Sequence, residues 1–327
     1  MALGSRRSCT TSSPALLQTR QKVKRSMLSG ILPIDKPRGM TSHDVVAAVR
    51  RLYGLRAVGH TGTLDPDASG LLLLCLGKAT RLAHFFEALE KTYWTVLRLG
   101  ICTDTQDATG TVIRRCEVPS FTRAQVSAVC DRFRGTLQQI PPMYSAVKHQ
   151  GERLYRLARQ GKTVVRQARQ IAIRRLEILD QRTPDITLGV TCSKGTYIRT
   201  LGEDIGVALG CGAHIVHLQR CRIGHFSLQQ AYPLAWLEQQ TSREAVLQAV
   251  MPVAEALAFL PSLRLTEQQH IALDRYRERT LSALIGTLIA GPQPATGYRL
   301  CTPSRETVAI LQRQSLSSEK WTLYTPP

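Results

Sequence analysis

Residues able to do chemistry are concentrated in one octapeptide, Gly-His-Thr-Gly-Thr-Leu-Asp-Pro, which begins at Gly59 and ends at Pro66. Gly59 and Gly62 have no Cβ, so the backbone at these positions can bend sharply or approach a ligand closely. Pro66 favours an extended conformation for Asp65 and cannot continue a hydrogen-bond ladder. We therefore expect a rigid loop that presents the Asp65 carboxylate, with the His60 imidazole close by in the sequence.

Elements on both sides must position this loop. The apolar run Leu71–Leu76 follows it directly and predicts a buried strand. Ahead of the loop, residues 31–42 predict a short strand that runs into a turn. Thr41, with Asp44 three residues later, forms a capping-box pattern and begins a helix. That helix is predicted to end at Gly54 and to bury Val45, Val46, Val49 and Leu52.

Strand and helix patterns continue beyond residue 90. Residues 103–110 form a polar turn, and Thr122 with Gln125 forms a second capping box. The remaining elements are predicted strands over 93–99, 171–179 and 186–192, with a turn at 180–185, and helices that end at Gly135 and Gly210.

The end of the chain has a separate character. A linker near 240–260 leads to a helical pattern over 263–284. Short β-like pieces follow around Leu300, 308–311 and 321–324. This pattern predicts a small α+β module of about 70 residues.

The charge balance is strongly basic. Lys and Arg number 43 against 24 Asp and Glu, a formal net charge of +19, and the pI is about 10.0. Such an excess favours a polyanionic partner, because neutralised phosphates release condensed counterions. A basic surface without a specific role is the alternative. The nine cysteines form no Cys-x-x-Cys pair, which favours reduced thiols in a cytoplasm. No apolar run approaches the ~18 residues that a membrane span needs.

Much of the positive charge lies in residues 134–175, which hold ten Lys or Arg and the single acid Glu152. Tyr144 and Tyr155 are interleaved with basic residues, a pattern that suits a surface gripping phosphates and stacking bases. A solvated, charged helix face is the alternative interpretation. The basic residues nearest the two tyrosines are Lys148, Arg153, Arg156 and Arg159.

Motifs for bound cofactors are missing. No Gly-x-Gly-x-x-Gly occurs, and the P-loop pattern fails at Gly77-Lys78 because Leu72 replaces its first glycine. We therefore expect no bound nucleotide or redox cofactor. The spacing of the one His/Cys-rich segment matches no common zinc pattern, so no metal is expected. That segment contains Cys211, His214, His217, Cys221 and His225.

The octapeptide resembles the active-site motif of the TruB family of tRNA pseudouridine synthases, and at least five spaced motifs extend the resemblance over residues 28–235. The resemblance implies an α+β fold with a mixed, largely antiparallel central sheet flanked by helices. It implies a catalytic domain over 28–250, with an RNA-clamp insertion at about 134–175. More weakly, residues 251–327 resemble the PUA-like RNA-binding domain of bacterial members.

The same resemblance implies a reaction. A TruB-type enzyme isomerises uridine to pseudouridine at position 55, in the T-loop of tRNA, after flipping the base out of its stack. Because nothing is added or lost, no cofactor is required. Two alternatives stay open: a tRNA chaperone that grips the elbow without catalysis, and a guide-RNA-dependent enzyme acting on ribosomal RNA. The basic insertion argues against the guided enzyme, in which partner proteins and guide RNA position the substrate.

Three catalytic residues follow from the resemblance. Asp65 matches the catalytic aspartate, the nucleophile or carboxylate partner of the ring. Tyr93 matches the tyrosine that stacks on the target base and handles protons. Arg199 matches the arginine paired with the aspartate, and its charge is expected to keep that carboxylate ionised.

The resemblance also implies residues that bind the substrate and a motif that supports the loop without touching substrate. His60 matches the histidine that inserts into the RNA loop, while Tyr197 and Leu218 match residues packed around the flipped uracil. Residues 36–42 match a motif that braces the catalytic loop. Residues 140–148 begin the clamp for the tRNA T-arm, in which Lys148, Arg153 and Arg156 are expected to bind RNA. No protein partner is expected, and a monomer is predicted.

Residues 1–27 lie outside the family pattern. They contain no acidic residue and are rich in Ser, Thr and Arg. We expect a disordered extension, or an upstream start codon with Met27 as the real beginning, and a cytoplasmic protein. An organelle transit peptide is the alternative, and it would place the protein in an organelle.

Overall fold

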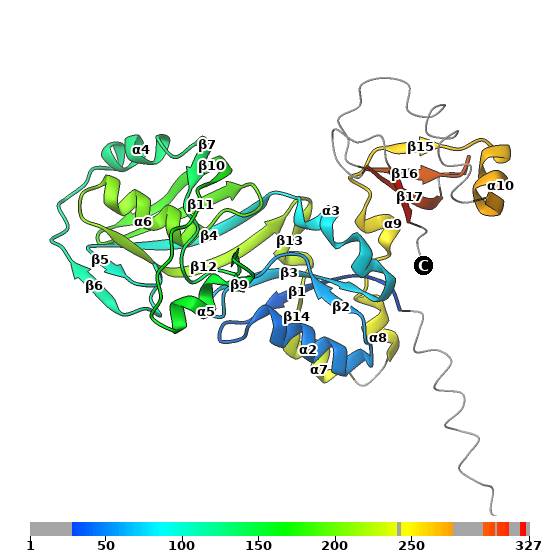
Figure 1. Ribbon diagram of the computed structural model, residues 1–327, viewed down its shortest axis with the longest axis horizontal. Coiled ribbons are helices and arrows are strands. Elements are labelled where there is room, and N and C mark those ends of the chain that lie inside the picture. The colour runs from blue at the N-terminus through cyan, green and yellow to red at the C-terminus, as the bar shows by residue number, and fades with distance from the viewer. Residues whose placement is uncertain (1–27, 241–242, 277–296, 305, 314–320, 325–327) are drawn as a thin grey trace, which may run out of the picture.

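The computed structural model describes residues 28–240, 243–276, 297–304, 306–313 and 321–324. A ten-stranded sheet forms its larger part (Figure 1). The strands are β1 (Gly30–Lys36), β2 (Val58–His60), β3 (Ser69–Leu76), β4 (Lys91–Leu99), β7 (Gly135–Gln139), β10 (Arg169–Arg182), β11 (Asp185–Cys192), β12 (Ala213–Ile223), β13 (Phe226–Ser227) and β14 (Tyr232–Pro233).

The strand order is β14-β1-β3-β12-β4-β11-β10-β7, with β2 pairing β3 and β13 pairing β12. Among the described strand pairs of this ten-stranded sheet, only β1–β14 and β3–β12 are parallel. The expected mixed, largely antiparallel sheet is therefore confirmed. Strand β12 is central to the site, because it joins the half that carries β3 to the half that carries β4.

The described helices surround this sheet, except α10 (Glu267–Tyr276), which lies beside the smaller sheet formed by the last part of the chain. The others are α2 (Ser42–Tyr53), α3 (Ala83–Glu87), α4 (Arg123–Asp131), α5 (Leu154–Arg159), α6 (Ile198–Ala208), α7 (Leu234–Gln239), α8 (Arg243–Gln248) and α9 (Val253–Ala256), with 3-10 turns η1 (Gly77–Leu82) and η2 (Leu228–Gln230). Two small hairpins complete the larger part: β5 (Ile101–Thr103) with β6 (Val112–Arg115), and β8 (Lys148–His149) with β9 (Glu152–Arg153). Among the described residues, no helix is both long and apolar enough to cross a membrane.

Strand β3 is buried on both faces, which explains why its sequence is a continuous apolar run instead of an alternating one. Leu72 and Leu74 belong to a cluster with residues of α2 and α7. Leu71 and Leu73 point the other way, into a cluster with residues of η1, α3 and α9. The catalytic-loop candidate is thus attached to the most deeply buried strand of the molecule.

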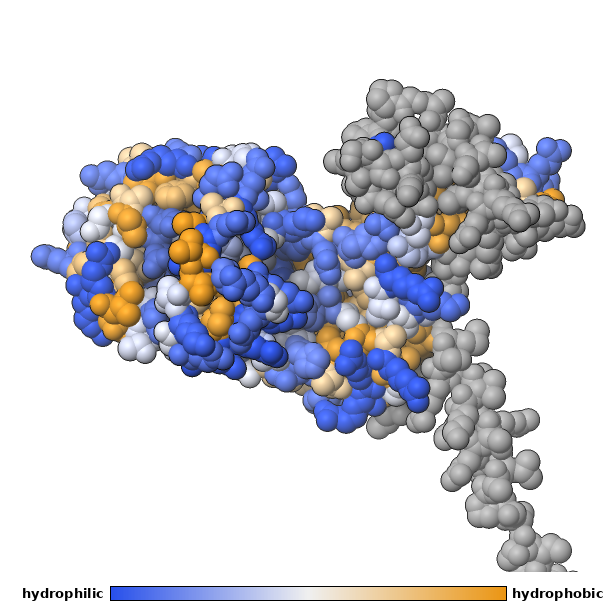
Figure 2. Space-filling model, in the orientation of Figure 1, coloured by the Kyte–Doolittle hydropathy of each residue, from blue (hydrophilic) through white to orange (hydrophobic). Residues whose placement is uncertain are grey.

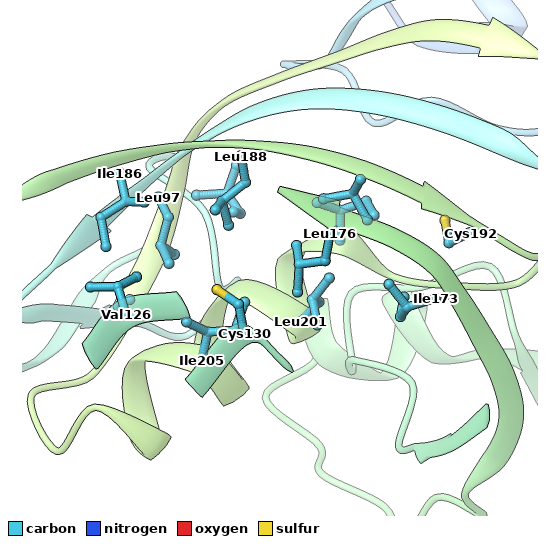
Figure 3. Packing of buried hydrophobic residues seen from close by; sticks show 14 of the residues in the cluster. Leu97, Val126, Cys130, Ile173, Leu176, Ile186, Leu188, Cys192, Leu201 and Ile205 are labelled. Carbon is cyan, nitrogen blue, oxygen red and sulfur yellow. The ribbon is translucent and has the colours of Figure 1, made fainter. Parts of the chain in front are cut away.

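Helices α4 and α6 cover one face of β4, β11 and β10 (Figure 3). Strand β11 alternates strictly between buried and half-buried residues, as expected for a sheet with one covered face. Figure 3 shows Leu188 and Leu97 of the strands facing Val126, Cys130, Leu201 and Ile205 of the two helices. This packing sets the position of α6, whose second residue is Arg199.

The first capping box is confirmed. Thr41 caps α2 and exchanges hydrogen bonds with Asp44, and Gly54 ends the helix in the left-handed conformation, with φ 62°. Val45 and Val49 are buried, but Leu52 is 41% exposed, so its predicted burial is wrong. Leu52 is the next-to-last residue of the helix and lies on the same helical side as Val45, beyond the part of that side that the rest of the protein covers.

The last part of the chain forms a four-stranded sheet of β15 (Ser262–Arg264), β16 (Gly297–Cys301), β17 (Thr307–Arg313) and β18 (Trp321–Tyr324), with α10 beside it. The predicted helix over 263–284 starts too early, since Leu263 lies in β15. Its end lies outside the described residues, as does the predicted tail 1–27. Ile310 of β17 is fully buried in the same cluster as Phe85 and Phe86 of α3, so this sheet packs against the part of the larger body that α3 forms.

Candidate active site

The loop between β2 and β3 carries Asp65, and residues 36–42 hold it from one side. The Ser42 hydroxyl donates to the Leu64 carbonyl at 3.1 Å and accepts from the Leu64 amide at 2.8 Å. The fully buried Lys36 ammonium donates to the Pro66 carbonyl at 3.2 Å, and also to the carbonyls of Pro37 and Met40. Burial lowers the pKa of Lys36 to about 8, although Asp65 opposes that shift.

Arg199 contacts Asp65 directly, as expected. Its Nε lies 2.9 Å from Asp65 Oδ2, and its Nη2 lies 3.3 Å from Oδ1. The remaining donors are used as well: Nη2 donates to the Tyr144 carbonyl and Nη1 to the Thr105 carbonyl, each at 2.8 Å. Nη1 also lies 3.4 Å from Asp107 Oδ2. The guanidinium is therefore fixed on several sides.

The two partners differ in access to solvent. The Arg199 side chain is 6% exposed, whereas the Asp65 side chain is 39% exposed. A buried cation thus holds a carboxylate that keeps an open side. Such a carboxylate can meet an incoming ligand without losing its orientation.

Burial raises the pKa of Asp65 above its ordinary value, and the nearby carboxylate of Asp107 acts in the same direction. The charges of Arg199 and Lys36 lower it. The expected effect of Arg199 is therefore present in direction but does not outweigh desolvation. A carboxylate of this kind is more basic than a free aspartate, and its ionised form depends on the arginine.

Tyr93 and Arg220 are direct neighbours across β4 and β12. Arg220 is 1% exposed and donates to three carbonyls on or beside the catalytic loop: Leu71 at 2.8 Å, Gly62 at 3.0 Å and Thr63 at 3.4 Å. Burial raises the pKa of the Tyr93 hydroxyl, while Arg220 opposes the rise. Arg220 therefore links the loop to the strand that carries the tyrosine.

Gly70, the second residue of β3, lies at this contact. A Cβ there would lie 2.4 Å from the Arg220 carbonyl oxygen, and the backbone φ of 101° is strained for any other residue. The glycine is required because β3 and β12 pair closely at this point.

The other expected site residues lie around this centre. His60 is half-buried, and its Nδ1 accepts from the Gly62 amide at 3.3 Å. Burial, with a contribution from Arg220, lowers the pKa of His60, which favours a neutral ring. Half-buried Tyr197 precedes α6, and the Gln139 side chain bonds both its amide and its carbonyl. Half-buried Leu218 lies on β12 opposite Thr95.

Two family models match this chain: the TruB family pseudouridylate synthase N-terminal domain over residues 50–198, and the tRNA pseudouridylate synthase B C-terminal domain over 199–258. The chain is 46% identical over 250 residues to tRNA pseudouridine synthase B of Pseudomonas aeruginosa (strain UCBPP-PA14), covering 76% of this chain and 82% of the relative. It is also 46% identical over 287 residues to the Syntrophotalea carbinolica protein of that name, covering 85% and 94%. The chain belongs to the TruB family of pseudouridine synthases.

Solved structures agree with the TruB family fold. The chain superposes on a chain of a Cbf5-Nop10-Gar1 complex with a TM-score of 0.64 and 25% identity, covering 94% of this chain and 86% of the other. An archaeal box H/ACA sRNP Nop10-Cbf5 complex gives a TM-score of 0.63 at 24% identity, covering 93% and 88%. The expected pseudouridine synthase fold is confirmed.

The basic residues of 134–175 in this TruB family chain do not all have the same surroundings: some bond within the protein and others are exposed. Four arginines of this basic stretch bond within the protein: Arg134 to the Leu176 carbonyl, Arg166 to the Pro141 carbonyl, Arg174 to Glu90 and Arg175 to Glu177. Lys148, Arg153 and Arg156, on β8, β9 and α5, are exposed, as is Arg159, whose guanidinium lies 5.6 Å from the centre of the Tyr155 ring. In Figure 2 the surface over α5 is mostly hydrophilic with small hydrophobic patches.

Sequence reasoning missed Arg220, Asp107 and the backbone carbonyls that hold Arg199. Arg220 stands in a strand next to other polar residues, and no motif marks it. Asp107 falls in the predicted polar turn, where an aspartate is an ordinary turn former. As for metals, no group of three or more His, Cys, Asp or Glu able to hold an ion occurs among the described residues.

Proposed function

We propose that this chain isomerises uridine to pseudouridine at position 55, in the T-loop of tRNA. The single observation that carries the proposal is the half-open Asp65 carboxylate fixed by the buried Arg199 guanidinium. The relatives named tRNA pseudouridine synthase B, 46% identical over three quarters of this chain or more, support tRNA as the substrate. The reaction breaks the bond from the sugar to N1 of uracil and forms a bond to C5. The C5 proton leaves and N1 gains one, so no cofactor is needed.

Each residue has a role in this proposal. Asp65 acts as the ionised nucleophile, and Arg199 stabilises its charged form. Tyr93 stacks on the flipped uracil, and its raised pKa keeps the hydroxyl protonated, so that it can donate a proton. His60 enters the RNA loop as a neutral ring, and Tyr197 with Leu218 packs around the base.

The surrounding surface has a proposed role in holding the RNA. The exposed Lys148, Arg153 and Arg156 grip phosphates of the T-arm. The sheet β15–β18, within a domain over 251–327, acts as a PUA-like RNA-binding unit beside a catalytic domain over 28–250. We propose that the chain acts as a monomer in the cytoplasm, where its described cysteines, all free, would stay reduced.

The test is release of tritium from a tRNA transcript labelled at C5 of uridine, with no cofactor or guide RNA added. The expected result is release of one equivalent from the wild-type protein, none from Asp65→Asn, and none from a transcript in which C replaces U55. Filter retention must show that Asp65→Asn still binds the normal transcript and that the wild-type protein still binds the transcript with C in place of U55. Binding without release by the wild type would favour the chaperone alternative, and release only after addition of a guide RNA would favour the guided enzyme. Either result would overturn the proposal.

A further inference from the structure

Gln106 has an unusual backbone. Its φ is 65°, in the left-handed region that residues other than glycine rarely adopt. Among the described residues other than glycine, only Gln150 in the β8–β9 turn also has a positive φ. Such conformations persist where the surrounding structure imposes them, and they occur often at functional sites.

The Gln106 side chain bonds to α6 at both of its polar atoms. Its Nε2 donates to the Glu203 carboxylate, and its Oε1 accepts from the Thr200 hydroxyl at 2.9 Å. Thr200 directly follows Arg199 in the helix and is buried. The amide therefore attaches the turn 103–110 to the first turns of the helix that carries the arginine.

The backbone of the same turn is attached to β12. The Ile215 amide donates to the Gln106 carbonyl at 3.0 Å, and the Ala108 amide donates to the Ile215 carbonyl at 2.9 Å. An isolated parallel bridge joins Asp107 to Ile215. The turn thus spans the gap between strand and helix and is fixed to both.

The two residues that flank Gln106 both serve Arg199. Thr105 gives its carbonyl to Nη1 at 2.8 Å, and Asp107 places Oδ2 at 3.4 Å from the same nitrogen. The other carboxylate oxygen of Asp107 accepts from the hydroxyls of Thr105 and Thr109. A change in the backbone at position 106 would move both acceptors at once.

We propose that Gln106 is a positioning residue for the pseudouridine synthase reaction: by attaching the turn 103–110 to α6, it holds Thr105 and Asp107 where they fix Arg199 against Asp65. The inference rests on the proposed function for its turnover readout. In the part of the chain that the structure describes, the side-chain hydrogen bonds of Gln106 go to α6, so it acts on Asp65 through Arg199.

A glycine substitution separates the role of the Gln106 side-chain amide from that of its left-handed backbone. Gln106→Gly keeps the left-handed backbone without strain but removes the amide. We expect it to lower the single-turnover rate about tenfold to 100-fold, since a misplacement near 1 Å can cost that much. The Kd for tRNA should stay within about twofold, because both polar atoms of the Gln106 side chain are bonded to α6 and the exposed arginines of α5 are unchanged. Wild-type turnover in Gln106→Gly would show that only the backbone conformation matters, and would overturn the proposal.

An exchange of partners is the sharper test. Gln106→Glu alone places two carboxylates against each other and should lose turnover. The double variant Gln106→Glu with Glu203→Gln restores one donor and keeps the net charge of the wild type. It should recover most of the lost rate. Thermal melting should show that both variants are folded. If the double variant is then no faster in single turnover than Gln106→Glu, the inference is overturned.

A readout without tRNA separates this inference from the proposed function. Asp65 faces Arg199, Asp107 and Lys36, and displacement of the arginine removes a charge that lowers its pKa. Carboxyl 13C NMR titration of the free protein should therefore give a higher Asp65 pKa in Gln106→Gly than in wild type. An equal pKa would contradict the inference even if wild-type turnover is normal. A raised pKa in a protein without turnover would leave the inference standing while the proposed function failed.

Discussion

Arg199 and Asp65, 134 residues apart in the chain, meet through two nitrogen–oxygen contacts of 2.9 and 3.3 Å, with the arginine buried and the aspartate partly open. The arginine is held from behind by the carbonyls of Thr105 and Tyr144. These carbonyls belong to the 103–110 turn and to the basic stretch. The geometry of one carboxylate therefore depends on three distant segments.

Arg199→Lys should lower the single-turnover rate by about 100-fold or more while leaving tRNA affinity nearly unchanged. A lysine keeps the charge but cannot make two parallel contacts to Asp65 and also reach both carbonyls. Quench-flow measurement of tritium release, with filter binding in parallel, checks this. A rate within threefold of wild type would show that charge alone suffices.

Lys36→Met should reveal a pH-dependent contribution to stability. The pKa of Lys36 is about 8 in the folded protein and 10.5 as the ordinary value, so above pH 8 the unfolded chain binds more protons at this group. Its contribution to the free energy of unfolding therefore rises with pH, by up to about 1.4 kcal/mol per unit, and levels off near pH 10.5. The free energy of unfolding of wild type minus that of Lys36→Met should therefore rise from pH 8 to 10 in urea titrations. A constant difference would contradict the assigned shift.

Replacing Arg153, Arg156 and Arg159 together by Gln should weaken tRNA binding and flatten its salt dependence. Each lost phosphate contact reduces the slope of log K against log salt by about 0.7 to 0.9. The matched control replaces three exposed arginines outside the stretch, Arg51, Arg132 and Arg182, and removes the same charge. Equal slopes for the two triple variants would show that the stretch makes no phosphate contacts of its own.

The sequence was most informative where local rules suffice. The Thr41 and Thr122 capping boxes and the apolar run of β3 follow from short-range patterns, and all three are confirmed. Leu52 was misjudged because helical spacing alone does not say how far a buried face extends. Leu263 was taken as helical because its apolar spacing fits a helix, although it pairs with Leu300 in a sheet.

The contact between Arg199 and Asp65 was predictable only from the family resemblance, since 134 residues separate the two and no local rule joins them. Arg220 could not be found in this way, because its partners are carbonyls that any residue possesses. The direction in which the pKa of Asp65 is shifted could not be predicted from the sequence either. It depends on how much water is excluded, which only the packed structure defines.

The loop that carries Asp65 is bonded to Lys36, Ser42 and Arg220, and through these residues to β1, α2 and β12. Active-site loops commonly open locally, well before the whole protein unfolds. Here an opening that frees Asp65 would expose a buried ammonium and a buried guanidinium, so it requires disruption of the central sheet. Amide protons of the loop should therefore exchange as slowly as those of the core, and loss of activity on heating should coincide with global unfolding.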